Sequence, residues 1–527
     1  MFCCMDEQER IERRAHVRLI ITEVLMFLSV ILLVGFLTLI VMGYSFNLKE
    51  LGGSGEVVER SGLVQISSAP AGATIFIDGD APLLLATNAS RTMLAGEHEI
   101  SLSRDGFSGW SKKIVVTEGM MYRLNYPRLF KEEREKEEVM RFYASAEVSD
   151  RIDKISEDEK VKTYAGKIKF VSVSPNNEQM MILLDKELYL VNINDNTPVL
   201  KILAVPSEDG SSVAEITTIE SAEWSGNSER LLAKMNGEWV VINVRNAKET
   251  VWLTKLLSEN GVNDIKFENE AGDRLLVLNA KKELAELNVR EEELSDVLLE
   301  NVERFDNDGD KVVYLAKTEF IDEWRLDGQE GTVMVEGYGV FGYRVGDEES
   351  HRIVRTEGDK DKIRIAIMQY FQDIYVGVYD GGYGGGRFSM LIRNGWVSGD
   401  GAMAQIIGEK VDFDVTSMKK RGKGMVFELV GAEKKAKVFD IEAMAMTEID
   451  TTGCGWVDEF LRYRIDDGKL SVLDYDGLNE RTLVDSNVAN GHEVVISGNG
   501  RWMYYFGREE TNNSGEIRET LIREKIN

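Results

Sequence analysis

The feature that most constrains the fold is a short pattern that recurs along the C-terminal part of the chain. Each copy has a β-favouring run that ends in an apolar residue, a polar turn made with Asn, Asp or Gly, and a second β-favouring run. Two such runs around a tight turn predict a pair of antiparallel strands. The clearest copies span residues 170–184, 222–233, 265–278, 302–315 and 494–505.

The spacing of these copies predicts how they assemble. Their apolar anchors are separated by 51, 43 and 38 residues and lie at Val173, Trp224, Phe267 and Phe305. Repeats of this length are typical of four-stranded β-propeller blades. Weaker copies begin near Ile363, Val411 and Trp456. We therefore predict a mainly β fold in which residues 161–527 form a propeller of seven or eight blades, closed by pairing of the last copy with a strand at 161–164.

An uncharged apolar segment precedes the repeats. Residues 24–42 contain no charged side chain, and these 19 residues would form a helix about 28 Å long, which matches the hydrocarbon core of a bilayer. A cleaved signal peptide is the alternative, but its apolar region is usually only about 7–15 residues long. Residues 43–46 also lack an A-x-A cleavage site. We expect a retained transmembrane helix over residues 19–43.

Flanking charges predict the orientation of this helix. Lys49 is the nearest basic residue on its C-terminal side, whereas the N-terminal side carries Arg10, Arg13, Arg14 and Arg18. The positive-inside rule then makes residues 1–18 cytoplasmic and everything after the helix extracytoplasmic. Residues 44–61, which contain a Gly-Gly-Ser-Gly run, predict a flexible linker.

The cysteines fit the same division of the chain. Cys3 and Cys4 precede the helix, where they are either reduced thiols or lipidated. Cys454 is the single cysteine beyond it, so the extracytoplasmic part cannot form an internal disulfide. Its stability must come from packing.

Residues 62–127 predict a small β-rich unit. Turn-forming pairs such as Asp78-Gly79 and Asp105-Gly106 separate β-favouring runs at 63–66, 74–77, 97–103, 112–117 and 121–126. In the third run His98, Ile100 and Leu102 alternate with polar residues, which places one strand face in a core. We expect an antiparallel β-sandwich in which His98 is a packed residue and not a catalytic base.

The turns of this unit resemble those of the PEGA domain, a β module named after its Pro-Glu-Gly-Ala turn. The resemblance rests on Pro70-Ala71-Gly72-Ala73, Ile75-x-Ile77-Asp78-Gly79, Leu94-x-Gly96-x-His98-x-Ile100, Gly106-Phe107 and Trp110. Ala71 replaces the Glu of the family name, and residues 83–87 lack the usual G-x-T-P sequence. PEGA modules occur in surface or envelope proteins of bacteria and archaea, so the resemblance implies an envelope protein in which this unit is a spacer above the membrane.

The turns of the longer repeat resemble the S-P-D-G-type turns of TolB-like and WD40-like β-propellers. The resemblance is clearest at Ser174-Pro175-Asn176-Asn177 and Ser497-Gly498-Asn499-Gly500. It implies the fold alone, because propellers host hydrolases, lyases and scaffolds alike. Membrane-anchored envelope proteins of bacteria with reduced genomes have a similar arrangement of the two modules.

Residues 128–160 change the character of the chain. They include the charge-dense run KEEREKEE at 131–138, in which Glu133 and Glu137 are one helical turn apart. A run of this kind is usually a solvated face. We therefore predict a charged helical connector without a binding role.

The sequence offers few candidates for chemistry. Asp306-x-Asp308-x-Asp310 lacks the Gly and Glu positions of an EF-hand, and we expect a solvated hairpin there instead of a calcium site. The glycine-rich run at 381–386 lacks the G-K-[ST] of a P-loop and predicts an inter-strand loop at the mouth of the ring. No His pair has metal-ligand spacing, and no G-x-S-x-G motif occurs. We predict no catalytic, cofactor-binding or metal-binding residues, although a Trp on a channel-end loop could stack on a sugar.

Net charge limits the partners. A charge of −28 at pH 7 argues against nucleic acid, whose phosphates are bound by neutralising Lys and Arg. We interpret the chain as a non-enzymatic, membrane-anchored protein of the cell envelope whose propeller face contacts a protein or cell-wall polymer. The alternative is a hydrolase or lyase with channel carboxylates, which would have to converge from different blades within about 5–10 Å. A sensor is disfavoured, because about twenty cytoplasmic residues are too few for an output domain.

Overall fold

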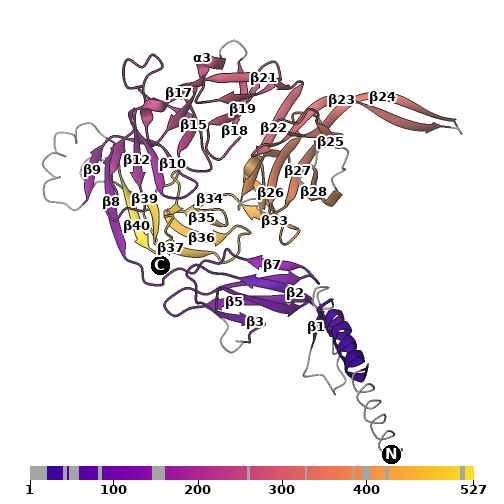
Figure 1. Ribbon diagram of the computed structural model, residues 1–527. Helices are drawn as coiled ribbons and strands as arrows, with labels where there is room; N and C mark the ends of the chain where they lie inside the picture. Colours follow the sequence, from indigo (N-terminus) through magenta and orange to yellow (C-terminus); the bar gives the residue numbers. More distant parts are fainter. Residues whose placement is uncertain are drawn as a thin grey trace, which may run out of the picture. The chain divides into compact units, whose positions relative to one another are not determined.

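The computed structural model divides the chain into two compact units, Met1–Phe130 and Lys131–Asn527 (Figure 1). The structure describes residues 20–38, 44–46, 58–80, 86–144, 161–257, 261–326, 329–382, 385–394, 404–421, 426–510 and 517–527. Strands dominate both units, which confirms the predicted mainly β fold.

The apolar segment of the first unit forms one helix, Ile20–Thr38. Its 19 residues span about 28 Å at about 1.5 Å per residue, and no part of it is buried against protein. A helix of this kind either crosses a membrane as an anchor or acts as a signal sequence. The predicted span begins one residue earlier, and its last five residues, 39–43, lie outside the described part of the chain, as do the predicted cytoplasmic residues.

Two small sheets form the rest of the first unit. One contains β1 (Tyr44–Phe46), β2 (Val58–Ile66) and β4 (Ala89–Leu94), and β7 (Met121–Leu124) also pairs with β2. The other contains β3 (Thr74–Ile77), β5 (Gly96–Ser103) and β6 (Trp110–Val116). Alternate residues of these strands are buried in a core that includes Val64, Ile66, Ile75, Ile100 and Leu102. The predicted sandwich is therefore present.

The structure corrects three details of this unit. Strand β7 runs parallel to β2, with Leu63 opposite Met121, so the sandwich is not purely antiparallel. Strand β4 buries only Met93 and has no apolar alternation, which is why no strand was predicted there. Part of the predicted linker is also ordered, because β1 pairs with the first residues of β2.

The turn residues of this unit adopt the backbone conformations and hydrogen bonds that are typical of their residue types. Asp78 and Gly79 have φ of 52° and 87°, the left-handed pair of a type I′ hairpin turn. The backbone N–H groups of Gly72 and Ala73 both donate to Thr87 Oγ1 at 3.0 Å, which anchors the turn after Pro70. His98 is held by Asp78, with 2.7 Å between Nδ1 and Oδ2, and by the Leu94 carbonyl oxygen at 2.9 Å. His98 is therefore a hydrogen-bonded structural residue.

Eight sheets follow one another along the second unit (Figure 1), within the described part of the chain. The first four are β10 (Ile168–Val173), β11 (Gln179–Leu184), β12 (Glu187–Asn192) and β13 (Leu200–Ile202); β14 (Ile219–Trp224), β15 (Arg230–Met235), β16 (Glu238–Asn243) and β17 (Val251–Trp252); β18 (Val262–Phe267), β19 (Arg274–Asn279), β20 (Leu284–Asn288) and β21 (Glu293–Leu299); and β22 (Val302–Asp308), β23 (Lys311–Leu326), β24 (Gln329–Arg344) and β25 (His351–Thr356).

The next three sheets are β26 (Arg364–Tyr370), β27 (Asp373–Gly382), β28 (Gly385–Asn394) and β29 (Ala404–Val411); β30 (Val415–Arg421), β31 (Val426–Gly431), β32 (Lys435–Asp440) and β33 (Ala445–Asp450); and β34 (Cys454–Trp456), β35 (Leu461–Asp466), β36 (Lys469–Asp474) and β37 (Arg481–Val484). The eighth contains β38 (Val495–Ile496), β39 (Trp502–Glu510), β40 (Ile517–Lys525), β8 (Lys136–Tyr143) and β9 (Lys162–Ala165). Short helices η3 (Ala247–Glu249), α3 (Leu253–Leu257) and η5 (Ala432–Lys434) lie between strands.

Neighbouring sheets pack face to face. One apolar cluster joins Met181 and Leu183 of the first sheet to Leu231 and Ala233 of the second. Equivalent clusters join the following sheets up to the sixth, and a further one joins the eighth sheet to the first. The first strands of successive sheets also touch, as β22, β26 and β30 do. The second unit is therefore a propeller with the first strand of each sheet innermost.

The predicted helical connector at 128–160 is wrong over its described residues, 128–144, and residues 145–160 lie outside the described part of the chain. Its charged run enters β8, which pairs antiparallel with the C-terminal strand β40 and parallel with β9. Met140 and Phe142 of β8 are buried in the cluster between the eighth and first sheets, so the short alternation at 140–142 outweighs the helical charge pattern. The strand expected at 161–164 does join the last sheet as β9, but β8 lies between it and β40.

Ion pairs fix this closing strand. Arg523 Nη2 lies 2.6 Å from Glu137 Oε2, and Arg134 Nε lies 2.9 Å from Glu524 Oε2. The alternation of Glu, Lys and Arg in the run thus matches basic and acidic residues of β40. Charges that suggested a solvated helix instead set the register of a strand.

The turn between the first two strands is held by the same serine hydrogen bonds in three of the sheets. Ser174, Ser225 and Ser497 are almost fully buried, and each hydroxyl accepts from the backbone N–H five residues on and donates to an Asn side chain two residues on. A Ser-x-Asn sequence therefore closes each hairpin locally. This local closure explains why the repeat was visible in the sequence.

The closure by β8 gives the first prediction. A chain that begins at residue 131 should unfold cooperatively, whereas one that begins at 161, the predicted domain boundary, loses β8 and exposes the edge of β40. We expect the shorter chain to aggregate or to melt at a lower temperature by circular dichroism. Phe142→Ala should cost about 3–5 kcal/mol, with Lys136→Ala as the exposed control on the same strand. Equal melting of the two truncated chains would contradict the assigned role of β8.

Candidate functional site

A cavity of about 1050 Å³ opens at one end of the propeller. Its lining comes mainly from first strands and the segments next to them, in the first, fourth, fifth, sixth, seventh and eighth sheets. The second strands of the sixth and seventh sheets add Glu428 and Arg462 among others. Val173, Asp308, Gln369, Arg421 and Trp456 each lie at or near the carboxyl end of such a strand. The carboxyl ends of the innermost strands therefore surround the cavity, and its volume is in the range of small-ligand sites.

Charged side chains from different sheets meet within the ring. Lys266 Nζ lies 2.6 Å from Asp306 Oδ1, which joins the third sheet to the fourth. Lys420, from the sixth sheet, donates to the carbonyl oxygens of Asn307 at 2.5 Å and Ile367 at 3.3 Å. Glu223 and Asp264 interact electrostatically with this group. Acidic side chains thus do converge from three blades, but two lysines lie among them.

The pKa values of these carboxyls are driven apart. Burial raises the pKa of Glu223 and of Asp264, and Lys266 offsets only part of this effect. Burial acts in the same direction on Asp306, but Lys266, Lys420 and hydrogen bonds outweigh it and lower the pKa of Asp306. Burial also opposes the charged form of Lys266, yet the three carboxyls together raise its pKa. The Glu223 side chain is itself exposed, so the rise in its pKa comes from the surrounding protein, which removes part of its hydration.

The acidic triplet at 306–310 is not a solvated hairpin. Asp306 and Asp308 lie in β22, and they accept the backbone N–H groups of Ile367 at 3.0 Å and Gln369 at 2.6 Å. Asp310 alone occupies the turn, where it pairs with Arg344 at 2.6 Å. Asp306 and Asp308 therefore join two neighbouring innermost strands, and this use of the two carboxylates explains why they are two residues apart.

A second cluster lies where the sixth and seventh sheets line the cavity. Trp456 Nε1 donates to Glu428 Oε1 at 3.0 Å, and Arg421 Nε lies 3.2 Å from Glu428 Oε2. The guanidinium carbons of Arg421 and Arg462 lie 5.2 Å and 5.8 Å from the centre of the indole ring. The tryptophan of the described cavity lining is thus already covered by cations, which argues against its stacking on a sugar.

The glycine-rich run is the inter-strand loop that was predicted, because it joins β27 to β28. It lies at the opposite end of its sheet from the turn between β26 and β27, and none of its described residues lines the cavity. Close packing explains the glycines. A Cβ on Gly381 would lie 2.8 Å from the Lys362 carbonyl oxygen, and one on Gly386 would lie 2.4 Å from that of Asp380.

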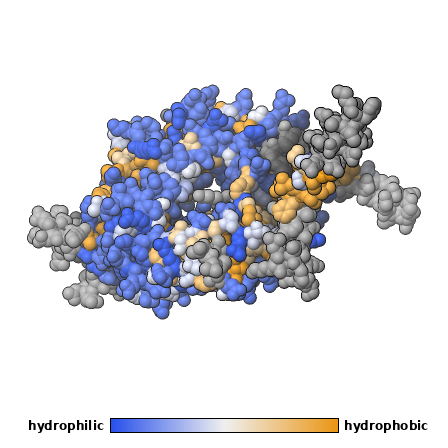
Figure 2. Space-filling model, turned by 60° about the horizontal axis from the view of Figure 1, so that its bottom comes forward, coloured by the Kyte–Doolittle hydropathy of each residue, from blue (hydrophilic) through white to orange (hydrophobic). Residues whose placement is uncertain are grey.

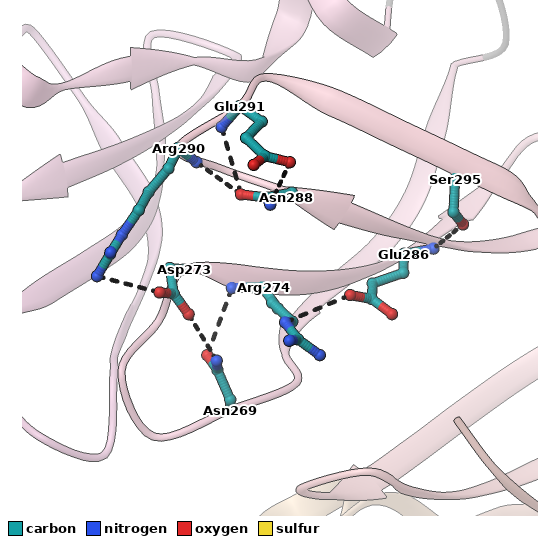
Figure 3. A network of polar contacts seen from close by, with 8 residues as sticks. All are labelled: Asn269, Asp273, Arg274, Glu286, Asn288, Arg290, Glu291 and Ser295. Atoms are coloured by element: carbon teal, nitrogen blue, oxygen red, sulfur yellow. Dashed lines mark hydrogen bonds and ion pairs between the residues drawn. The ribbon is translucent and has the colours of Figure 1, made fainter. Parts of the chain in front are cut away.

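Another polar network lies in the third sheet and its turns (Figure 3). Asp273 accepts from Asn269 at 2.6 Å and pairs with Arg290 at 3.1 Å, and Arg274 lies 3.6 Å from Glu286. These partners satisfy one another and come from a single blade. The network fixes turns and offers no convergent site. Within the described residues, no group of three or more His, Cys, Asp and Glu side chains is arranged to hold a metal ion.

Sequence reasoning missed the charged residues of the channel, although a signal was present. Glu223 directly precedes the anchor Trp224, and Lys266 directly precedes the anchor Phe267. Neighbouring residues of a strand point to opposite faces, so a residue beside an anchor that packs against the preceding sheet faces the next sheet. Arg462 carried no such signal, because its place depends on the pairing of β34 with β35.

Comparison with known proteins supports the PEGA module. Residues 61–129 match the family model of the PEGA domain. No curated protein matches the chain. Similar solved structures include the β-propeller domain of Cps50 (Swd1) from Myceliophteria thermophila, with 10% identity, a TM-score of 0.35 and coverage of 68% of this chain and 97% of that one. Hsv2 from Kluyvelomyces marxianus has 8% identity, a TM-score of 0.34 and coverage of 67% and 96%.

A prolyl endopeptidase structure is also similar, with 10% identity and a TM-score of 0.39. The similarity covers 68% of this chain and 54% of that one. At these identities and TM-scores the matches carry no inference about activity or partners. The sheet topology itself establishes the propeller.

The charges within the ring predict different effects on the free energy of unfolding when Asp306 and Glu223 are neutralised. Asp306→Asn should destabilise the fold at pH 7 by about 3–5 kcal/mol, because it leaves Lys266 without its ion pair. Glu223→Gln should leave the free energy of unfolding at pH 7 unchanged or raise it, because burial disfavours the charged form of Glu223. Urea titrations measure both values.

The pH dependence follows from the same shifts. The lowered pKa of Asp306 stabilises the fold above its ordinary value of 3.8, and this contribution is lost as the pH falls through the lower folded-state value. The raised pKa of Glu223 instead costs stability as the pH rises above its ordinary value of 4.5. Asp306→Asn should flatten the acid limb of the stability curve. Equal losses for Asp306→Asn and Glu223→Gln at pH 7 would refute this division of roles.

Proposed function

We propose that this protein is a membrane-anchored, extracytoplasmic binding or scaffold protein of the cell envelope. In this role the end of the propeller that carries the 1050 Å³ cavity contacts a protein or a cell-wall polymer. The observation that carries the proposal is the order of the modules, in which an apolar helix precedes a PEGA domain and a propeller. The apolar helix and the PEGA match support the location at the cell envelope, and the propeller supports the binding role.

The architecture suits binding by a tethered domain. A ring of eight packed sheets presents its strand ends as one rigid face, and tethering raises the effective concentration of that face at the membrane, so weak contacts can suffice. Hydrophilic residues dominate the surface in the view of Figure 2, which suits an aqueous compartment. Polar lining residues in the cavity allow specific recognition.

A second function is favoured by one observation, the convergence of Glu223, Asp264 and Asp306. Their pKa values move in different directions, as in enzymes that use one carboxylic acid and one carboxylate. The pairing of Asp306 with Lys266 and with the Ile367 N–H makes a structural use of Asp306 the simpler interpretation. A propeller hydrolase or lyase is therefore the alternative proposal.

Capture and turnover experiments separate these proposals. The purified protein should retain an envelope protein or wall fraction, with weaker retention at higher salt, because exposed charges are screened over about 8 Å at physiological ionic strength. It should hydrolyse none of a panel of peptides, glycans and esters. Turnover that Glu223→Gln abolishes without unfolding the protein would establish the enzyme instead, and failure to retain any envelope component would refute the binding role.

The topology is tested by labelling. A membrane-impermeant maleimide applied to intact cells should react with a cysteine introduced at Gly53 and should not react with Cys3 or Cys4, because the basic flank places the N-terminus inside. The experiment compares the chain that carries Gly53→Cys with the chain that does not. Cys454→Ser in both chains removes the thiol of the propeller. The reverse labelling pattern would contradict the proposed orientation.

A further inference from the structure

The arginine of the seventh sheet that lines the cavity is buried without enough partners. The Arg462 side chain is 1% exposed and lies among the lining residues. Its Nη2 donates to the Asp450 carbonyl oxygen at 2.5 Å. Within the described part of the chain, Nε and Nη1 have no hydrogen-bond acceptor. A buried guanidinium stays ionised, so its missing partners leave both charge and donors uncompensated.

Other acceptors around Arg462 are already committed. Glu428 accepts from Trp456 and pairs with Arg421. Asp458 accepts the backbone N–H groups of Phe460 at 2.9 Å and Leu461 at 2.8 Å. The neighbouring Arg464 has its own carboxylates, Glu480 at 3.0 Å and Asp450 at 3.5 Å. Glu428 and Asp450 act on Arg462 electrostatically, but among the described residues no carboxylate forms an ion pair with it.

The cavity lining adds a second cation near this arginine. Lys419 is exposed in the lining, and its Cα is paired across the sheet with that of Glu428. The guanidinium groups of Arg421 and Arg462 each lie within 6 Å of the centre of the same indole ring, at 5.2 Å and 5.8 Å. A concave site that combines these cations with unfilled donors suits a ligand that is both a hydrogen-bond acceptor and an anion.

We propose that the cavity binds a compact oxyanion, a carboxylate or a phosphate, that contacts Arg462 with support from Lys419 and Arg421. The inference deepens the proposed binding role and rests on it, since it names the chemical group that the propeller face recognises. Long polyanions are excluded by the net charge of −28, which repels them outside the cavity. The ligand is therefore a small anion or a thin chain that carries its charge at one end.

Isothermal titration of the full-length protein in detergent at fixed ionic strength tests this site. The probes are acetyl-trialanine with a free C-terminal carboxylate, the same peptide as its amide, and inorganic phosphate. We expect saturable binding of the peptide acid or of phosphate, which identifies the preferred oxyanion, and no binding of the amide. These defined probes need no membrane orientation or envelope partner, so a failure here leaves the proposed function standing and overturns only the anion site.

Variants locate the binding. Arg462→Met should weaken the bound oxyanion about 10-fold to 100-fold, as expected for a hydrogen bond to a charged group. Without ligand the same variant should melt at an equal or higher temperature, because unfilled donors are removed, whereas a purely structural arginine would lower it. Arg464→Met, two residues along the same strand, removes the same charge and should leave the affinity unchanged.

A third variant keeps the test decisive if Arg462→Met does not fold. Lys419→Met alters an exposed side chain and should weaken binding about twofold to fivefold. Equal binding of peptide acid and amide, no binding of either oxyanion, or unchanged affinity in both cavity variants would each overturn the proposal.

Discussion

The pairing of β8 with β40 is the constraint on which the propeller depends. In a ring of sheets each apolar face is buried by the next sheet, so the last sheet must be complete before it can cover the first. The C-terminal strands leave the edge of β40 open, and β8 fills it from the N-terminal side of the unit. Met140 and Phe142 then join the cluster that unites the eighth and first sheets. The cavity, whose lining includes both of these sheets, exists only when this closure has formed.

Closure also explains where the charged residues lie. An innermost strand packs its apolar side chains against the preceding sheet, and the residues between them face the innermost strand of the next sheet. Charges placed there need partners from other sheets, as Lys266 finds in Asp306 and Lys420 finds in two backbone carbonyls. Glu223 and Asp264 have raised pKa values, because the desolvation of their charged forms by surrounding protein outweighs the attraction of the lysines. The charges within the ring are thus only partly paired. The direction of each pKa shift shows whether the ion pairs or the desolvation has the larger effect on that group.

The parts of the fold that could be predicted are those with a local physical cause. The Ser-x-Asn turns close their own hairpins, so the blade repeat is visible without any tertiary information. The Asp78-Gly79 turn is similarly local. Strand β8 could not be recognised in this way, because its partner β40 is almost 400 residues away and its charges at helical spacing favoured the wrong element.

The candidate site shows the same limit. Asp306 and Asp308 were noticed as a motif, but their roles as acceptors depend on β26, about 60 residues further along the chain. Arg462 looks like an ordinary strand residue until β34, β35 and Asp450 enclose it. A propeller can nevertheless contain a buried arginine with unpaired donors, because the apolar contacts between its eight sheets stabilise the fold by more than this one residue destabilises it. The acidic surface then sets the range of ligands. The net negative charge of the protein repels every anion in solution, whereas Arg462 attracts an anion only within the cavity. The site therefore prefers a short anion that fits into the cavity to a larger anion of higher charge.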